Sequence, residues 1–276
     1  MSTQRSSARA DEAALKPDYV RFCDGIRSLT GIDLWQYRPA QMERRLRSHA
    51  ERNGCHDLDA YLKVLRTDAA AMDSFLDRMT INVSELFRNP ERFEELEKRI
   101  IPALLAAHPR GLKVWSAGCS YGAEVYSLAI LMRELAPNQR HELFAFDIDE
   151  RVLARAREGA FGATDMRNVT PARRQRWFTE EKVDGVIRWK ASQELRSMIT
   201  FKRFDLLKDP FPKGMHLVAC RNVVIYFNDD AKDLLYRKFF DCLVPGGVLF
   251  VGATERINNA DSMGWVKAGT FFYGHP

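Results

Sequence analysis

The stretch from Lys113 to Ala129 constrains this chain most, because it joins an apolar strand, a glycine turn and the start of a helix. Gly118 and Gly122 carry no Cβ, so the backbone between them can approach a bound molecule closely. This arrangement is typical of folds that hold nucleotide-like cofactors. Glu124 at the helix start argues against a pyrophosphate, because its carboxylate repels an anion and can pair with a cationic group.

Length and composition set the class of protein. With 276 residues and 46% hydrophobic content, the chain can bury a full core, and we expect two domains. The five cysteines are widely separated and form no Cys-x-x-Cys pair, so neither a disulfide framework nor a zinc site is indicated. No apolar run reaches the roughly 20 residues of a membrane span. We therefore expect a soluble, cytoplasmic protein without a metal, whose residues 1–17 form a disordered tail. A net charge of +5 is too small to imply nucleic-acid binding.

Helical spacing of the apolar residues predicts a small all-helical domain over 18–85. Pro39 suits a first helical turn and Gly54 suits a stop, so we expect a helix over 39–53. This helix carries a basic stripe, formed by Arg38, Arg45 and Arg52 at seven-residue intervals and widened by Arg44 and Arg47. The stripe is either a solvated helix face or a docking surface for an acidic partner.

A linker helix over 86–110 precedes a domain over 111–276, in which strands and helices alternate. The expected strands cover 113–116, 142–146, 199–204, 216–220 and 248–251. Such alternation predicts a parallel, doubly wound sheet. Residues 172–198 do not fit this pattern, and they predict an inserted antiparallel β-subdomain around an Asp184-Gly185 turn. It is either a plain surface hairpin or a partner-recognition element.

Ligands of parallel sheets bind beyond the carboxyl ends of the strands, so the residues that follow each strand are the candidate site. Asp147 follows the second strand and can accept hydrogen bonds from ribose hydroxyls, although a helix N-cap is an alternative role. Asp205 and Leu206 follow the third strand and are positioned for an adenine edge and face. Arg221 and Asn222 directly follow the fourth strand. They are polar, whereas residues that continue into a core would be apolar.

Two other enzyme classes fit the glycine turn less well. Gly118 to Gly122 also match a G-x-S-x-G nucleophile elbow with Ser120 as nucleophile, but the preceding region is helical and lacks an oxyanion loop. A dinucleotide dehydrogenase needs a third glycine and places a pyrophosphate where Glu124 would repel it. A cationic cofactor, the sulfonium S-adenosylmethionine, fits better, because Glu124 can pair with its amino group.

The residues resemble the CheR-type chemotaxis receptor methyltransferases over nearly the whole chain. The resemblance rests on the segments Thr80–Arg88, Trp115–Ser127, Phe146–Asp149 and Cys220–Phe227. It implies an α/β fold, with a Rossmann-like S-adenosylmethionine-dependent domain, a helical amino-terminal domain that touches the receptor, and an inserted β-subdomain that grips a receptor tail in some members. The implied reaction transfers a methyl group to receptor glutamates and leaves S-adenosylhomocysteine.

The resemblance also implies residue roles. Arg88 and Tyr226 would act at the transfer site, with Tyr226 facing Arg88. The cofactor would be held by Asn82, Ser84, Arg88, Gly118, Glu124, Asp147, Asp205, Leu206, Arg221 and Asn222. The receptor helices would dock on the basic stripe. Ala123, Val125 and His216 depart from the family pattern, and the loss of an acid at 123 could weaken cofactor binding. The alternative function is a signalling module that binds the cofactor or its product without turnover.

Overall fold

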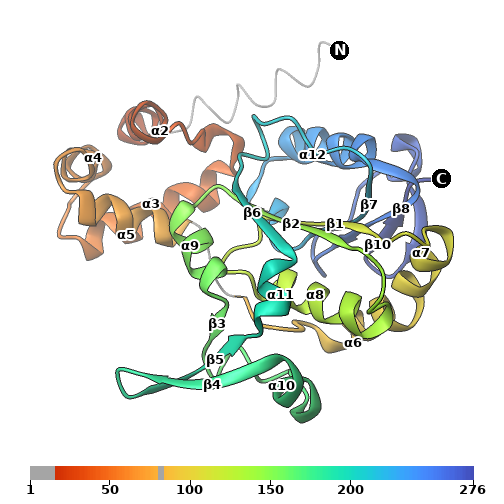
Figure 1. Ribbon diagram of the computed structural model, residues 1–276. Helices are drawn as coiled ribbons and strands as arrows, with labels where there is room; N and C mark the ends of the chain where they lie inside the picture. Colours follow the sequence, from red (N-terminus) through yellow and green to blue (C-terminus); the bar gives the residue numbers. More distant parts are fainter. Residues whose placement is uncertain (1–15, 80–83) are drawn as a thin grey trace. The chain divides into compact units, whose positions relative to one another are not determined.

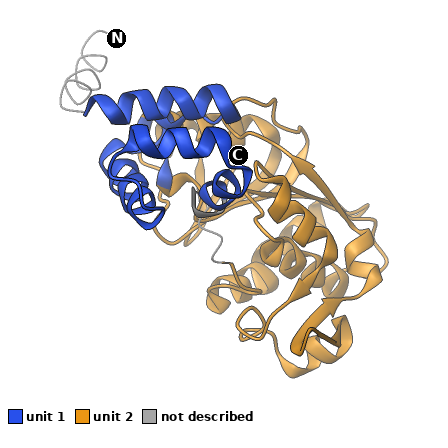
Figure 2. Cartoon of the chain, turned by 90° about the vertical axis from the view of Figure 1, so that its left-hand side faces the viewer, with its two compact units in different colours: residues 1–81, 226–229 blue, residues 82–225, 230–276 orange. Residues whose placement is uncertain are grey.

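The computed structural model describes residues 16–79 and 84–276, which divide into two compact units. Figure 2 shows them in different colours. Unit 1 contains the described residues of 1–81 together with 226–229, and unit 2 contains those of 82–225 and 230–276. A short segment from late in the sequence is therefore part of the helical amino-terminal unit.

Unit 1 is built from helices, as predicted. Its elements are α2 (Pro17–Thr30), η1 (Leu34–Gln36), α3 (Pro39–Arg52), α4 (Leu58–Thr67) and α5 (Ala69–Met79). The helix expected over 39–53 is α3, which begins at Pro39 because a proline at the first position gives up no helical hydrogen bond. The side chain of Asp57 caps α4 by accepting a hydrogen bond from Ala60 N at 2.7 Å.

Aromatic side chains form the centre of the unit 1 core. Phe22 on α2 stacks on Tyr61 of α4, with ring centroids 5.8 Å apart. Phe75 of α5 meets Phe22 edge-on at 5.9 Å. All three are at most 1% exposed. Edge-on and offset aromatic pairs add about 0.5–1.5 kcal/mol each beyond their burial, so this cluster fixes how α2, α4 and α5 pack.

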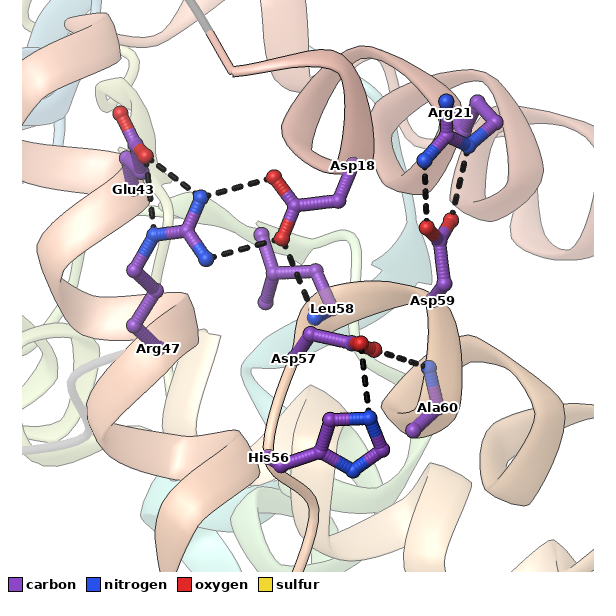
Figure 3. A network of polar contacts seen from close by, with 9 residues as sticks. All are labelled: Asp18, Arg21, Glu43, Arg47, His56, Asp57, Leu58, Asp59 and Ala60. Atoms are coloured by element: carbon purple, nitrogen blue, oxygen red, sulfur yellow. Dashed lines mark hydrogen bonds and ion pairs between the residues drawn. The ribbon is translucent and has the colours of Figure 1, made fainter.

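A partly buried polar network joins α2, α3 and α4 (Figure 3). The Arg47 guanidinium of α3 donates to both carboxylate oxygens of Asp18 on α2, each at 2.9 Å. It also donates to Glu43 Oε1, from Nη2 at 2.7 Å. Asp18 Oδ2 in turn accepts from Leu58 N at the start of α4 at 3.4 Å. Arg47 thereby connects three helices, and its hydrogen bond is the main reason that the pKa of Asp18 falls to about 2.

The main sheet of unit 2 has seven strands in the order β6-β2-β1-β7-β8-β10-β9. The strands are β1 (Lys113–Ala117), β2 (Glu142–Asp147), β6 (Ile199–Arg203), β7 (Met215–Cys220), β8 (Leu243–Val251), β9 (Val266–Gly269) and β10 (Phe272–Gly274). The first five are parallel to one another, which confirms the predicted parallel sheet. Strands β9 and β10, which form the antiparallel edge, were not predicted, because such short strands give too few residues for alternation to be recognised.

Helices cover both sides of this sheet, and Figure 1 shows α12 on one side and α8 on the other. The longer helices are α8 (Ala123–Leu135), α9 (Glu150–Glu158) and α12 (Asp229–Cys242). The helical stretch expected to be a linker forms α6 (Pro90–Glu95), η2 (Leu96–Ile100) and α7 (Ile101–Ala107). Phe93, Leu96 and Ile101 of this stretch are buried in the core of unit 2. The stretch is therefore an integral part of that core.

The inserted β-subdomain is a separate three-stranded antiparallel sheet, ordered β3-β5-β4 (Figure 1). Its elements are β3 (Ala160–Phe161), α10 (Pro171–Trp177), β4 (Phe178–Val183), β5 (Val186–Ala191) and α11 (Gln193–Ser197). The predicted hairpin is confirmed: Asp184 and Gly185 turn between β4 and β5 with φ of 51° and 80°, as a two-residue turn requires. The added strand β3 was not predicted.

The structure also bears on membrane insertion. Over residues 16–79 and 84–276, none of the helices combines the length and the apolar character that crossing a bilayer requires.

Replacement of Arg47 by Met is expected to lower the free energy of unfolding by about 1–2 kcal/mol at pH 7, because Asp18 loses its partner. The folded-state pKa of Asp18 is depressed to about 2, so this stabilisation is fully present above pH ~4 and is lost as the pH falls from 4 to 2. Urea unfolding at several pH values measures the difference. Arg44→Met, at an exposed position of the same helix, is the control. This role would be contradicted if the difference in free energy of unfolding between wild type and Arg47→Met were the same at pH 7 and at pH 2.5.

Candidate active site

The glycine loop between β1 and α8 lies against the turn that follows β7. Gly118, Ser120 and Gly122 all adopt positive φ, of 76°, 49° and 94°. Gly118 N donates to Phe146 O at 2.8 Å, which ties the loop to the end of β2. A Cβ added to Gly118 would lie 2.5 Å from Val223 Cγ2. Both the backbone conformation and the close approach therefore require glycine at this position.

Asp147 ends β2 and is oriented by two backbone groups. It is 9% exposed, and Oδ2 accepts from Ser120 N at 2.8 Å while Oδ1 accepts from Asp149 N at 3.0 Å. The N-cap of α9 is Asp149, which accepts from Arg151 N at 2.9 Å, so Asp147 does not have the alternative capping role. Burial raises the pKa of Asp147, and the two backbone hydrogen bonds oppose this shift.

Glu124 and Arg221 form a buried ion pair beside the loop. Arg221 Nη1 lies 3.6 Å from Glu124 Oε2, and the two side chains are 4% and 12% exposed. Ser116 Oγ on β1 donates to Glu124 Oε1 at 2.7 Å. Burial raises the pKa of Glu124 and lowers that of Arg221, while each charge opposes the shift of the other. Removal of either partner would leave the other charge buried, which typically costs about 3–5 kcal/mol.

The segment that carries Arg88 is fixed next to this pair. Arg221 Nη2 donates to Arg88 O at 2.9 Å and to Asn89 Oδ1 at 2.8 Å. Phe87 and Asn89 on either side have positive φ of 54° and 63°. The Arg88 charge also lowers the pKa of both Glu124 and Arg221, after the larger effects of burial and of the pair itself. Arg88 is thus half-buried within electrostatic reach of the pair.

Ser84 and Asn82 were predicted to line the site from the same segment. The hydroxyl of Tyr121, in the glycine loop, donates to Ser84 O and contacts Asp165 Oδ1 at 3.0 Å. Leu86 N donates to Asp165 O at 3.1 Å. Ser84 is therefore connected to the glycine loop through its backbone. Asn82 lies outside the described residues.

Asp205 and Leu206 follow β6 at the same sheet edge as Asp147. Phe204 N donates to Asp147 O at 2.8 Å, which joins the two strand ends. Asp205 Oδ1 accepts from Leu207 N at 2.9 Å and shapes the turn. Leu206 is 9% exposed, and its carbonyl accepts from Lys238 Nζ at 2.8 Å. The structure thus brings the ends of β2 and β6 together as predicted for parallel neighbours.

The turn after β7 is hydrogen-bonded to Glu255, a residue that the sequence patterns did not single out. Asn222 has a φ of 60°, and its N–H donates to Glu255 Oε2 at 2.6 Å. Glu255 follows the end of β8, so the rule that selected Asp147 and Asp205 would also have selected it. Tyr226, a few residues further on, belongs to unit 1, where the Arg45 guanidinium lies over its ring at 5.4 Å. The predicted pairing of Tyr226 with Arg88 stays a prediction.

Comparison with known proteins identifies the family. Residues 82–271 match the CheR methyltransferase SAM-binding domain, and residues 17–80 match the CheR methyltransferase all-alpha domain. The chain belongs to the CheR methyltransferase family. It is 39% identical to a chemotaxis protein methyltransferase of Listeria innocua, over 94% of this chain and 97% of that protein. It is 31% identical to the chemotaxis protein methyltransferase of Salmonella typhimurium, over 87% of this chain and 84% of that protein.

These matches establish S-adenosylmethionine-dependent methylation in chemotaxis as the activity of this CheR-family protein, and they leave the hydrolase and dehydrogenase hypotheses without support. The site fits the cofactor. The backbone at Gly118 approaches Val223 where no Cβ could be accommodated. Glu124 and Asp147 are buried carboxylates with raised pKa values, which a cationic ligand stabilises in their charged form.

Gly118→Ala is expected to weaken S-adenosylhomocysteine binding at least tenfold, because the new Cβ would overlap Val223 and displace the loop. Titration calorimetry measures the affinity. Gly185→Ala is the matched control, since its φ of 80° imposes similar backbone strain while no atom lies within 4 Å of the added Cβ. A Gly118→Ala/Val223→Ala double variant should recover part of the affinity. Equal affinities for Gly118→Ala and Gly185→Ala would show that the close approach is irrelevant to binding.

Proposed function

We propose that this protein transfers the methyl group to glutamate side chains on the cytoplasmic helices of bacterial chemoreceptors. The observation that carries the proposal is the position of Arg88, a cation beside the buried Glu124–Arg221 pair at the carboxyl edge of the sheet. A glutamate substrate is an anion, and a half-buried guanidinium is the group that proteins favour for orienting a carboxylate. The names of the chemotaxis methyltransferase relatives support a chemoreceptor as the substrate.

The Glu124–Arg221 pair suits the methionine end of the cofactor. That end is a zwitterion with one ammonium and one carboxylate, and the pair offers one acceptor and one donor of opposite charge. We assign the ammonium to Glu124. Asp147, fixed by Ser120 N and Asp149 N, is assigned to the ribose hydroxyls.

The remaining assignments complete the pocket. Asp205 and Leu206, at the end of the neighbouring strand, are assigned to the adenine ring. Asn222 closes the pocket from the turn after β7. The glycine loop and Ser84 supply backbone on the side that Tyr121 bridges.

The reaction needs little acid or base help from the protein. A glutamate carboxylate is ionised near pH 7 and is already nucleophilic. S-adenosylmethionine, when bound, supplies a methyl group activated by its sulfonium. The chain's task is to place the carboxylate oxygen in line with that group, and orientation of this kind can contribute roughly 7–11 kcal/mol. We assign this task to Arg88, with Tyr226 restricting its movement.

Arg88→Ala is expected to reduce methyl transfer by roughly 100-fold, as is typical when a preorganised charged donor is removed. S-adenosylhomocysteine affinity should change less than about fivefold, because Glu124, Asp147 and Arg221 remain. Radiolabel transfer to a receptor helical fragment and calorimetry measure the two effects. Arg110→Ala removes an exposed arginine of the same unit and is the control.

Two outcomes would contradict the proposal. Unchanged transfer by Arg88→Ala would remove its assigned role. If wild-type protein binds the cofactor tightly but forms no methyl ester on any receptor fragment, the chain would instead be the non-catalytic binding module.

The basic stripe on α3 divides into two groups. Arg47 is bonded to Asp18 and Glu43, and burial lowers the pKa of Arg45, whose guanidinium lies over Tyr226. Arg44 and Arg52 are exposed, and Arg38 is 53% exposed with Asp229 at 3.8 Å. We therefore propose that Arg38, Arg44 and Arg52 dock the acidic receptor helix, while Arg45 and Arg47 act mainly within unit 1.

An Arg44→Glu/Arg52→Glu variant is expected to raise the KM for a receptor fragment about three- to tenfold at low salt, with kcat retained. The effect should shrink at 0.5 M salt, because exposed charges are screened over a few ångströms there. The control is Arg110→Glu/Arg140→Glu, which reverses two exposed charges of unit 2. A KM that does not depend on salt in either variant would favour the solvated-face interpretation.

The β-subdomain is a second candidate contact. Strand β4 lies at the edge of its sheet, and the hairpin tip exposes Val183, Val186 and Ile187 by 44–56%. An extended receptor tail could add to such an edge by backbone hydrogen bonds.

All five cysteines are unpaired thiols in buried positions, which suits a protein that meets the receptor in the reducing cytoplasm.

A further inference from the structure

Glu255 is a buried carboxylate whose hydrogen-bond donors are backbone groups. It is 3% exposed and follows β8. Oε2 accepts from Asn222 N at 2.6 Å and from Gly252 N at 2.8 Å. Oε1 accepts from Val223 N at 2.8 Å and from Ile225 N at 3.3 Å. Three of these four donors come from the turn that directly follows Arg221.

This arrangement makes the shape of the turn depend on the carboxylate. A buried charge is tolerated only where hydrogen bonds replace its hydration, and here the turn supplies them. Asn222 has a φ of 60°, a conformation that costs about 1 kcal/mol or more and persists only where the surroundings hold it. Gly252 leaves room for this contact, since an added Cβ would lie 2.4 Å from Glu255 Oε2 and 3.0 Å from Asn222 N.

The same turn meets the cofactor site at two points. Arg221, the residue before it, pairs with Glu124 at 3.6 Å. Val223, within it, is the residue against which Gly118 of the glycine loop packs. A shift of the turn would therefore move both the ion pair and the loop.

We propose that Glu255 is a positioning residue for the cofactor site, acting through the backbone of residues 222–225 on Arg221 and on the glycine loop. This inference rests on the proposed function and extends it to a residue that contacts neither cofactor nor substrate. Gly252 is required for the same reason, because it leaves space for the carboxylate.

Two variants test the proposal by different routes. Glu255→Gln replaces one acceptor oxygen by an NH₂ group, which cannot accept hydrogen bonds from the backbone N–H groups of the turn. Gly252→Ala keeps the charge but displaces the carboxylate. Both are expected to weaken S-adenosylhomocysteine binding at least tenfold by calorimetry. Gly162→Ala is the matched control, because the nearest atom to its added Cβ is at an ordinary 3.7 Å. Gly252→Ala also covers the case in which Glu255→Gln fails to fold.

Nuclear magnetic resonance of the ¹⁵N-labelled wild type tests whether the carboxylate is coupled to the glycine loop, which a merely structural role in the turn would not require. Burial raises the pKa of Glu255, so its carboxylate takes up a proton as the pH is lowered through that value. The amide protons of Gly252, which contacts the carboxylate, and of Gly118 in the glycine loop, which packs against Val223, should then shift along one common curve.

The titratable groups near Glu255 are Cys220, Arg221 and Tyr236, and Glu124 lies beyond Arg221. Burial raises the pKa of Glu124 as well, so the curve of Gly252, whose N–H bonds only Glu255 of the two, identifies the carboxylate that a shared curve reports. Burial raises the pKa values of Cys220 and Tyr236 and Arg221 keeps its charge, so none of the three titrates in that range.

The outcomes separate this inference from the proposed function. Wild-type protein that fails to bind S-adenosylhomocysteine would overturn both. If wild type binds and Gly252→Ala binds within twofold of it, the positioning role of Glu255 is wrong while the proposed function stands. Amide shifts that do not follow a common curve in the wild type would overturn the positioning role as well.

Discussion

The buried ion pair between Glu124 and Arg221 is the interaction on which the candidate site depends. Both side chains are buried, and burial raises the pKa of Glu124 and lowers that of Arg221, which disfavours the charged form of each. Neither charge is stable at this position without the other. The pair also determines the path of the chain around it, because Arg221 donates to the backbone of Arg88 and to the side chain of Asn89. It therefore joins α8, the turn after β7 and the segment that carries the proposed substrate-orienting cation.

The segment that begins at Arg221 is held along its whole length. Glu255 fixes the turn by backbone hydrogen bonds. The following residues, 226–229, belong to the helical unit, where Arg38 N donates to Tyr226 O at 3.1 Å and Asn228 N donates to Gln36 O at 2.8 Å. One continuous stretch of chain thus leads from Arg221 of the candidate site into the helical unit.

Local patterns predicted most of the fold because they depend on few residues. Pro39 and Gly122 marked helix starts, and the Asp184-Gly185 pair marked the hairpin turn. The polar residues at strand ends identified Asp147 because parallel strands bring their carboxyl ends to one edge. Glu255 satisfies the same rule, because it follows the end of β8, but it was not among the residues selected. Strands β9 and β10 were missed because they are only four and three residues long, too short for an alternating pattern to be recognised.

The sequence by itself determined the class of fold, the cofactor and the family to which the chain belongs. Only the tertiary structure decided how the charges are paired. Arg45 and Arg47 were indistinguishable from Arg44 and Arg52 in the helical pattern, because spacing gives the helix face but not the neighbours on other helices. The structure places Asp18 against Arg47 and Tyr226 against Arg45. These partners lie 29 and about 180 residues away in the sequence, and packing alone brings them together.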